Sequence, residues 1–247
     1  MLVEQPRGNY RFLPGSPSLP FCGAVAPAPG YEIVRAQLDR PPPWRQGFER
    51  IEAHLAALGR PRQALCSVEL RCAQPYTPEA FAGFNVGYAE LLREWGLFVD
   101  GQGSTTRTNV APALHPPSEQ VLFAFAYTVP AADAPPTFVI SGAPERPEVR
   151  PGEASAEALR AKTADVVASL SERLAALDQG WPAVGAVAVY TPHDALPALR
   201  AELLPRLGPA AVHGLRWFDS RPPIVGLEIE IDARSVRREE LLGGSRG

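Results

Sequence analysis

Apolar residues in the first half of the chain follow two periods, which predict strands and helices in alternation. Apolar runs bounded by Pro and Gly are typical of strands, whereas apolar positions three and four residues apart are typical of helices. Phe48, Ile51 and Leu55 show the helical spacing, and Gly59 follows as a helix-ending residue. The elements predicted for this half are strands at residues 10–13, 19–26, 31–38, 64–72, 105–113 and 120–129, and helices at residues 46–58 and 77–95.

The second half repeats this order of elements after an Ala/Pro-rich linker at residues 130–136. Its predicted elements are strands at residues 137–141 and 184–190, helices at residues 155–177 and 193–207, and two closing strands within residues 213–232. The helical sequence of residues 49–58 also resembles that of residues 170–177. The sequence therefore predicts an α+β fold of two tandem units, residues 1–132 and 133–247, each a mixed β-sheet backed by two helices.

The closing segment, residues 213–232, is interpreted as two strands joined by a tight Arg-Pro-Pro turn. Its second strand alternates apolar residues with Glu228, Glu230 and Asp232, so the three carboxylates are expected on one face. Such a face is either solvated at a sheet edge or compensated by a cation, an arginine or a substrate proton. The matching strand at residues 120–129 has no acidic residue, so the fold does not require these carboxylates.

Composition restricts the function classes. The chain has 247 residues, 45% of them hydrophobic, which is enough for one large or two small packed domains. A formal charge of -3 and a sequence pI near 5.9 argue against nucleic acid as a partner. No apolar run is long enough to cross a bilayer, and the first residues lack the features of a secretory signal. We therefore expect a cytoplasmic protein without a membrane partner.

The residues that bind metals or form covalent intermediates show no recognisable arrangement. Cys22, Cys66 and Cys72 are an odd set without metal-ligand spacing, and the histidines form no paired motif. Lys162 is the only lysine and lies in a helical context, which does not favour Schiff-base chemistry. The sequence predicts no metal site and no cofactor.

Three segments resemble the reactive-intermediate deaminase family, the YjgF-like proteins: residues 81–88, residues 106–110 and residues 226–233. Tandem copies of this unit are similar to the chorismatases, a diverged branch that hydrolyses chorismate. The resemblance implies that each unit has the YjgF-like, or chorismate mutase-like, fold. It also implies sites in the clefts between units, and association as a homotrimer or a pseudo-trimeric assembly.

In that family an arginine on one strand holds the substrate carboxylate, and a glutamate on the next strand directs water. Arg107 matches the arginine in the first half, but Leu122 occupies the place of the glutamate. In the second half, Glu228 matches the glutamate and His213 occupies the place of the arginine. Each half departs from the family pattern by one residue, so a composite site between units is one interpretation.

The resulting candidates fall into two groups. The candidate catalytic residues are Glu228, supported by Glu230 and His213 as general acids or bases. The candidate anchors for a substrate carboxylate are Arg107, Arg216 and Arg221, since arginine can bind a carboxylate through two parallel hydrogen bonds. The structural alternative is that these residues are solvated or form salt bridges on strand surfaces.

We expect a hydrolase that acts on a small anionic metabolite carrying a carboxylate. The reactive group is either an imine or enamine, as in the deaminases, or an enol ether, as in the chorismatases. The alternative is a non-catalytic protein of the same fold that binds a small metabolite or serves as a scaffold.

Overall fold

The computed structural model describes residues 1–133 and 135–243. Its strands are β1 (Val3–Gln5), β2 (Tyr10–Leu13), β3 (Ala24–Pro27), β4 (Tyr31–Leu38), β5 (Leu65–Arg71), β6 (Phe98–Val99), β7 (Gln102–Gly103), β8 (Thr106–Pro112), β9 (Val121–Pro130), β10 (Phe138–Pro144), β11 (Ala186–Tyr190), β12 (Arg216–Phe218), β13 (Ser220–Arg221), β14 (Glu230–Ser235) and β15 (Arg238–Leu242). Its helices are α1 (Trp44–Ala57), α2 (Pro78–Glu94), α3 (Ala156–Ala176), α4 (Leu196–Glu202) and α5 (Leu204–Leu207), with 3₁₀ turns η1 (Arg62–Ala64), η2 (Trp181–Ala183) and η3 (Gly208–His213).

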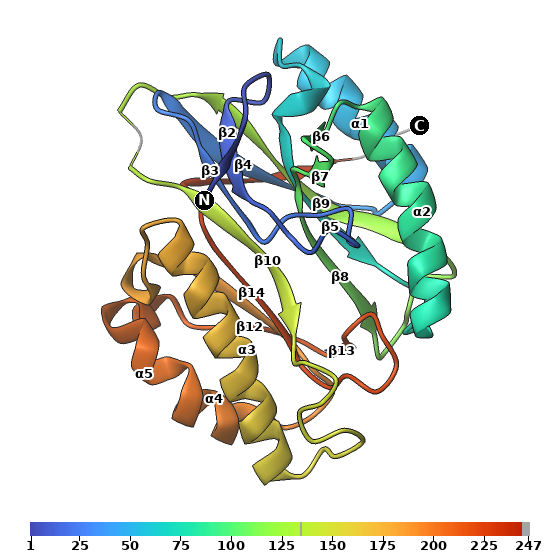
Figure 1. Ribbon diagram of the computed structural model, residues 1–247, viewed down its shortest axis with the longest axis vertical. Helices are drawn as coiled ribbons and strands as arrows, with labels where there is room; N and C mark the ends of the chain where they lie inside the picture. Colours follow the sequence, from blue (N-terminus) through green and yellow to red (C-terminus); the bar gives the residue numbers. More distant parts are fainter. Residues whose placement is uncertain (134, 244–247) are drawn as a thin grey trace.

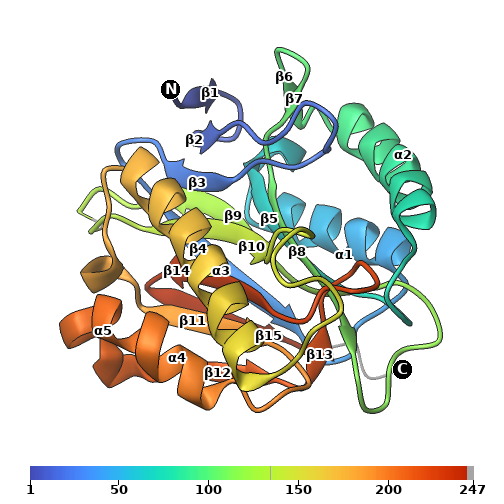
Figure 2. The same ribbon diagram turned by 60° about the horizontal axis from the view of Figure 1, so that its bottom comes forward.

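Two large sheets lie between two groups of helices (Figure 1). The seven-stranded sheet has the order β1-β2-β3-β10-β14-β11-β12, and the six-stranded sheet has the order β13-β8-β5-β9-β4-β15. Helices α1 and α2 cover the six-stranded sheet, whereas α3 runs across β10 and β14 with α4 and α5 beside it (Figure 2). The predicted α+β class, with helices backing each sheet, is confirmed.

The two long helices that flank the molecule begin at capping residues visible in the sequence. Thr77 Oγ1 accepts a hydrogen bond from the backbone N–H of Ala80 at the start of α2, and Ser155 Oγ does the same for Ala158 at the start of α3. Both caps satisfy a backbone donor that the first helical turn leaves without a partner. Helix α1 has no side-chain cap and begins at Trp44, before the predicted start.

Each sheet has its own apolar core on the side that faces its helices. On the six-stranded sheet, Phe48 and Ile51 of α1 pack with Leu70 of β5 and Tyr88 of α2. On the seven-stranded sheet, apolar residues of α3 likewise pack with Ile229, Ile231 and other buried apolar residues. Burial of these faces supplies most of the stabilisation, and it leaves the opposite faces of the two sheets toward each other.

The two halves exchange strands. Strands β1–β3 of the first half join the seven-stranded sheet through the pairing of β3 with β10. Strands β13 and β15 of the second half join the six-stranded sheet, beside β8 and β4 respectively. Neither sheet is therefore built from one half alone. The division of the chain between residues 132 and 133 stays a prediction.

The predicted hairpin over residues 213–232 is wrong. Strand β12 pairs in parallel with β11, β13 pairs with β8 of the other sheet, and β14 pairs with β10 and β11. The chain between them crosses from one sheet to the other, and its proline pair lies where Ile224 bridges to Tyr76. Because β14 is an inner strand, its acidic face is not a wet edge: Glu230 and Asp232 are 2% and 5% exposed. The solvated-edge alternative is therefore wrong for these two carboxylates.

No helix within the described part of the chain is long and apolar enough to span a membrane. The cytoplasmic location stays a prediction.

Candidate functional site

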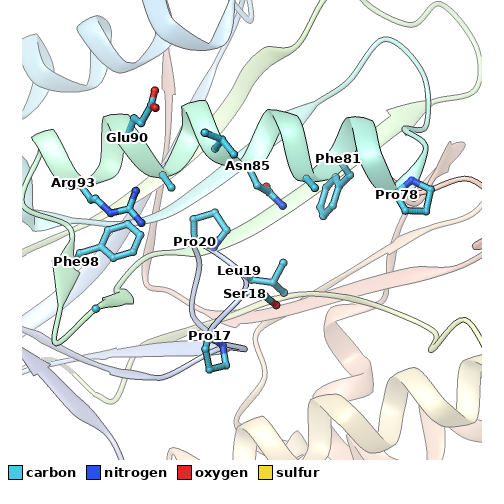
Figure 3. A pocket seen from close by; sticks show the side chains of 14 residues that line it. Pro17, Ser18, Leu19, Pro20, Pro78, Phe81, Asn85, Glu90, Arg93 and Phe98 are labelled. Atoms are coloured by element: carbon cyan, nitrogen blue, oxygen red, sulfur yellow. The ribbon is translucent and has the colours of Figure 1, made fainter.

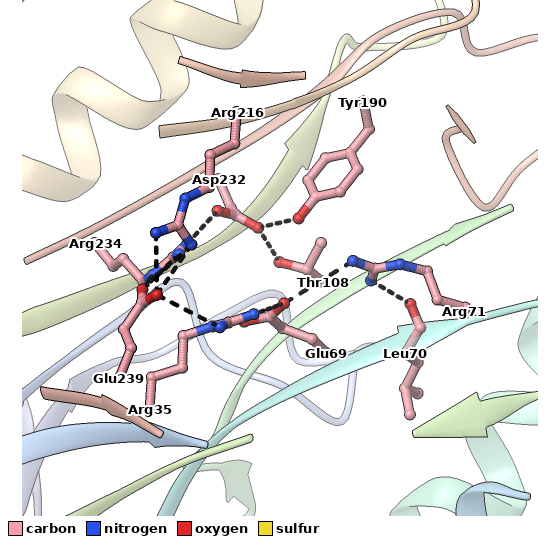
Figure 4. A network of polar contacts seen from close by, with 10 residues as sticks. All are labelled: Arg35, Glu69, Leu70, Arg71, Thr108, Tyr190, Arg216, Asp232, Arg234 and Glu239. Carbon is pink, nitrogen blue, oxygen red and sulfur yellow. Dashed lines mark hydrogen bonds and ion pairs between the residues drawn. The ribbon is translucent and has the colours of Figure 1, made fainter. Parts of the chain in front are cut away.

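The facing sides of the two sheets carry a buried network of charged groups (Figure 4). Arg35 of β4 donates to both carboxylate oxygens of Glu69 of β5, over 2.6 and 2.9 Å. Burial opposes ionisation of Glu69, but the Arg35 guanidinium outweighs it and lowers the pKa of this carboxyl to about 2. Thr108 of β8 donates to Asp232 Oδ2 across the interface over 2.9 Å, and Tyr190 of β11, in the same sheet as Asp232, donates to the same oxygen over 2.9 Å. The network therefore ties the two sheets together.

Arg107 lies on β8, on the side that faces α2, and is 3% exposed. Its Nη1 donates to Asn85 Oδ1 of α2 over 2.8 Å. Among the described residues, no carboxylate forms an ion pair with it. A guanidinium taken out of water without a counterion is costly, so the pKa of Arg107 falls to about 10, chiefly because of burial. An anion that enters this place would find an unneutralised cation.

Aromatic rings surround the Arg107 guanidinium. Its central carbon lies 4.2 Å from the ring centre of Phe21, 4.9 Å from Tyr88, 5.2 Å from Phe81 and 5.7 Å from Phe84. The rings stabilise the cation through their negative faces and fix its orientation without occupying its hydrogen-bonding edge.

A cavity of about 520 Å³ opens between α2 and the loop at residues 17–20 (Figure 3). Phe81 and Asn85, which both contact Arg107, line it from α2, and Pro20 lines it from the loop. The volume is sufficient for a small metabolite. The cavity thus extends from the surface to the residues that hold the arginine.

Glu230, at the start of β14, is the second unusual group. Its Oε2 is buried and makes no hydrogen bond to any described residue. Burial raises the pKa of this carboxyl to about 8, and Asp232 adds to the effect, whereas Arg107, Arg71 and Arg173 oppose it. Three arginines from three elements therefore act on one carboxyl that is largely neutral at pH 7. A buried acid with this pKa can donate a proton and take one back.

Gly142 of β10 determines where the Glu230 carboxyl lies. A Cβ atom at this position would collide with Glu230 Oε1, and it would lie 3.2 Å from Thr108 Oγ1. Only glycine leaves room for the carboxyl to lie against the β10 backbone, next to β8. On the same strand, Ser141 Oγ accepts from the Arg107 N–H over 2.9 Å and donates to the Arg107 carbonyl over 2.7 Å. These contacts hold β10 against the backbone of β8 at Arg107 and leave space for the Glu230 carboxyl beside Gly142.

Glu228 lies outside β14 and belongs to a different cluster. Its Oε2 is 2.6 Å from His193 Nε2 and 3.5 Å from Arg221 Nη1. Its backbone N–H donates to Glu145 Oε1 over 2.7 Å. The structure thus brings together Glu228 and Arg221, two of the predicted site residues, and adds His193, which the sequence pattern did not single out.

The other predicted residues lie apart from both clusters. His213 is exposed at the end of η3. Arg216 is half-exposed and donates to Glu239 Oε2 over 3.0 Å at the rim of the charged network. Their predicted roles in catalysis and in substrate binding stay predictions.

Several residues around Arg107 and Glu230 were not predicted as functional. Asn85 and Tyr88 show helical spacing, and such spacing does not distinguish a packed polar group from a site residue. Arg71 and Arg173 lie far from Glu230 in the sequence. Arg71 lies on β5 of the other sheet and Arg173 on α3, which packs on β10 and β14, so only the tertiary fold brings both near it.

The described residues include no group of three His, Cys, Asp or Glu side chains that could hold a metal ion. Burial raises the pKa of the Cys72 thiol to about 12, and the nearby Glu230 adds to this rise, so Cys72 remains a thiol at neutral pH. The expectation that the protein uses neither a metal nor a cofactor stays a prediction.

Comparisons with known proteins agree with this architecture. The model of the family "2-aminomuconate deaminase CnbZ" matches residues 2–240. A 2-amino-5-chloromuconate deaminase from Comamonas testosteroni is 34% identical over 246 residues, which cover 95% of this chain and 96% of that protein. A chorismatase structure shares the fold, with a TM-score of 0.51 and 15% identity over 87% of this chain and 77% of that chain. A YjgF/YER057c/UK114 family member from Mycobacterium tuberculosis matches 42% of this chain and 81% of its own, with a TM-score of 0.32 and 15% identity.

The resemblance inferred from the sequence is therefore confirmed, including its chorismatase-like arrangement. The chain is an enzyme of the deaminase type, and it belongs to the family of the 2-aminomuconate deaminase CnbZ.

Proposed function

We propose that this enzyme hydrolyses the amino group from an unsaturated amino dicarboxylate of the 2-aminomuconate type. In this proposal Arg107 binds one substrate carboxylate and Glu230 carries the proton. The family match and the 34% identical deaminase support the substrate class. The single observation that carries the site is the buried carboxyl of Glu230, unpaired and with a raised pKa, within the field of Arg107.

The reaction consumes water and releases ammonia. A proton added to a carbon of the enamine system converts the C–N single bond into the C=N bond of an iminium ion. Water then adds to the iminium carbon and loses a proton, which forms a C–O bond and leaves a carbinolamine. The amine takes a proton, the carbinol hydroxyl loses one, the C–N bond breaks, and a 2-oxo acid and ammonia remain. The step that needs an acid comes first, and the step that needs a base follows when water loses its proton.

Glu230 has the properties that both steps require. With a pKa of about 8 it is mostly protonated at pH 7 and can deliver the first proton. The carboxylate that results is stabilised by Arg107, Arg71 and Arg173 nearby, and it can then accept a proton from the attacking water. One side chain can act first as an acid and then as a base most effectively when its pKa lies close to the working pH.

Arg107 supplies the charge that a carboxylate substrate needs. Its guanidinium is held by Asn85 and by aromatic rings, so little conformational freedom is lost when an anion binds. Because the site is buried, the attraction between guanidinium and carboxylate is stronger than it would be in water. The two groups come from different halves of the chain, which agrees with the departure of each half from the family pattern.

The experiment is a turnover assay with the purified chain. We expect ammonium release from 2-aminomuconate, with one oxygen atom of the 2-oxo product derived from ¹⁸O-labelled water. A parallel assay with chorismate measures pyruvate and tests the enol-ether alternative. Saturable binding of 2-aminomuconate without ammonium release would favour the non-catalytic alternative. Pyruvate release without ammonium release would assign the site to chorismatase-type chemistry.

The expectations of a small anionic substrate, of a homotrimer or pseudo-trimeric assembly and of a cytoplasmic location form part of the same proposal. The family resemblance supports them, and sedimentation of the purified chain tests the assembly.

A further inference from the structure

A second cavity, of about 410 Å³, lies where the C-terminal ends of β5 and β8 meet β12 and β13. It shares no lining residue with the cavity beside Arg107. The groups that give it chemical character are Arg71, His115, Phe123, Phe218, Asp219 and Ser220. None of them takes part in the proposed reaction by direct contact with substrate.

Arg71 is the charged group at the base of this cavity, and it is 6% exposed. Its Nη1 donates to the carbonyl oxygen of the adjacent residue, Leu70, over 2.9 Å. Its Nη2 is buried and makes no hydrogen bond to any described residue. The carboxylate of Glu69 lies 4.0 Å from Nη2, but it already accepts both hydrogen bonds of Arg35. Arg71 therefore has hydrogen-bonding capacity that the protein leaves unused.

Aromatic rings surround the Arg71 guanidinium. The guanidinium carbon lies 4.0 Å from the ring centre of Phe123, 5.4 Å from Tyr190 and 5.6 Å from Phe218. Tyr190 and Phe218 are stacked, with ring centres 5.0 Å apart and an interplanar angle of 19°. The three rings hold the guanidinium by cation–π contact, and Phe123 and Phe218, which line the cavity, offer flat apolar surfaces to a neighbour.

We propose that this cavity is a second anion site, which binds a planar conjugated or aromatic monocarboxylate through Arg71. The carboxylate takes the free hydrogen bonds of the guanidinium, and the flat body of the ligand packs among the aromatic rings. Asp219 lines the same cavity and would repel a second negative charge, so the ligand carries one carboxylate. This restriction separates the site from the dicarboxylate pocket proposed around Arg107.

The inference does not depend on the proposed function, since it concerns binding and not turnover. The probe is 4-fluorobenzoate, titrated into the full chain and followed by ¹⁹F NMR. Two variants test the site: Arg71→Met removes the charge at similar length, and Phe218→Leu removes one ring. Arg200→Met, at an exposed position on α4, is the matched control, and Arg107→Met reports binding in the other cavity.

Arg71→Met is expected to weaken binding of the probe roughly tenfold or more, because the variant loses a buried charge-assisted hydrogen bond. Phe218→Leu is expected to weaken it about threefold, whereas Arg200→Met and Arg107→Met leave it unchanged. The neutral analogue 4-fluorobenzamide should bind roughly tenfold more weakly than the acid. Muconate, a dicarboxylate, should compete poorly for this site because of Asp219.

Three results would overturn the proposal. One is the absence of saturable binding up to about 10 mM probe, an affinity too weak for a built site. Another is binding that is lost in Arg107→Met and kept in Arg71→Met, which would place the probe in the first cavity. If Arg71→Met fails to fold, Phe218→Leu decides: unchanged affinity in that variant means that the aromatic cavity does not hold the ligand.

Discussion

The Arg107 guanidinium opposes the rise in the pKa of the Glu230 carboxyl, yet among the described residues the two groups form no ion pair. Both groups are buried, and each lacks the partner that buried charges ordinarily have. An unpaired buried cation beside a carboxyl with a strongly perturbed pKa is more typical of a functional site than of a structural salt bridge.

Stability and activity should depend on pH through Glu230. The pKa of this carboxyl rises from 4.5 to about 8 on folding, so the folded protein holds the proton more tightly than the unfolded chain does. The free energy of unfolding therefore falls as pH rises from about 4.5 to about 8, by roughly 2–5 kcal/mol from this group. The Glu230→Gln variant has no carboxyl group at this position that could lose a proton. We expect its melting temperature to exceed that of the wild type by a margin that grows between pH 5 and pH 8; a constant margin would contradict the raised pKa.

Arg107→Met should separate function from stability. Loss of the carboxylate anchor is expected to lower kcat/KM by about 10²–10³, chiefly through KM. The free energy of unfolding should change by less than about 2 kcal/mol, because removal of a desolvated charge offsets the loss of the bond to Asn85. Steady-state kinetics and urea unfolding measure the two effects, with Arg200→Met as the exposed control. Equal kinetics in the two variants would remove Arg107 from the site.

Gly142→Ala tests whether the position of the Glu230 carboxyl matters. The added methyl group meets Glu230 Oε1, so the carboxyl must move, and activity should fall roughly tenfold or more. Gly83→Ala is the control, since its Cβ would enter open space on α2 and should raise the free energy of unfolding by about 0.5–1 kcal/mol. Full ammonium release in Gly142→Ala would show that activity does not require the Glu230 carboxyl to lie where this structure places it.

The only lysine in the sequence belongs to a buried ion pair next to the start of β14. Lys162 of α3 is 1% exposed and donates to Glu145 Oε1 over 2.9 Å. The two oxygens of Glu145 accept the backbone N–H groups of Glu228 and Ile229, over 2.7 and 3.1 Å. Lys162→Met leaves the Glu145 carboxylate buried without its cation, so we expect the free energy of unfolding to fall by about 3–5 kcal/mol. Urea unfolding measures the loss.

A second variant shows whether an unpaired charge causes that loss. Glu145→Gln combined with Lys162→Met removes both charges, and it should recover part of the stability. A double variant as unstable as Lys162→Met alone would assign the loss to packing.

Hydrophobic spacing predicted the local structure well, because the buried side of a helix or strand appears in the sequence as apolar residues at regular intervals. Phe48, Ile51 and Leu55, which show helical spacing and are buried on α1, are examples. The pairing of β14 could not be predicted, since the proline pair before it fits a hairpin turn equally well. Nothing local indicates that the chain leaves one sheet and crosses to the other.

The same limit applies to the two glutamates. Strict alternation places Glu228 and Glu230 on one face, but the chain turns at Gly226, where φ is +88°, and β14 begins only at Glu230. Glu228 therefore faces His193 and Arg221, whereas Glu230 faces the seam beside Gly142. The alternation in the sequence predicted one shared face for the two acids, and the backbone turn places them in different surroundings.

The most direct test of the composite site compares Glu230→Gln with Glu228→Gln in ammonium release from 2-aminomuconate. The two substitutions are chemically identical and two residues apart. We expect Glu230→Gln to lower kcat by about 10²–10⁴, the contribution of a general acid and base, and Glu228→Gln to stay within about tenfold of the wild type. Full activity in Glu230→Gln together with an inactive Glu228→Gln would contradict the account and assign the chemistry to the cluster of Glu228, His193 and Arg221.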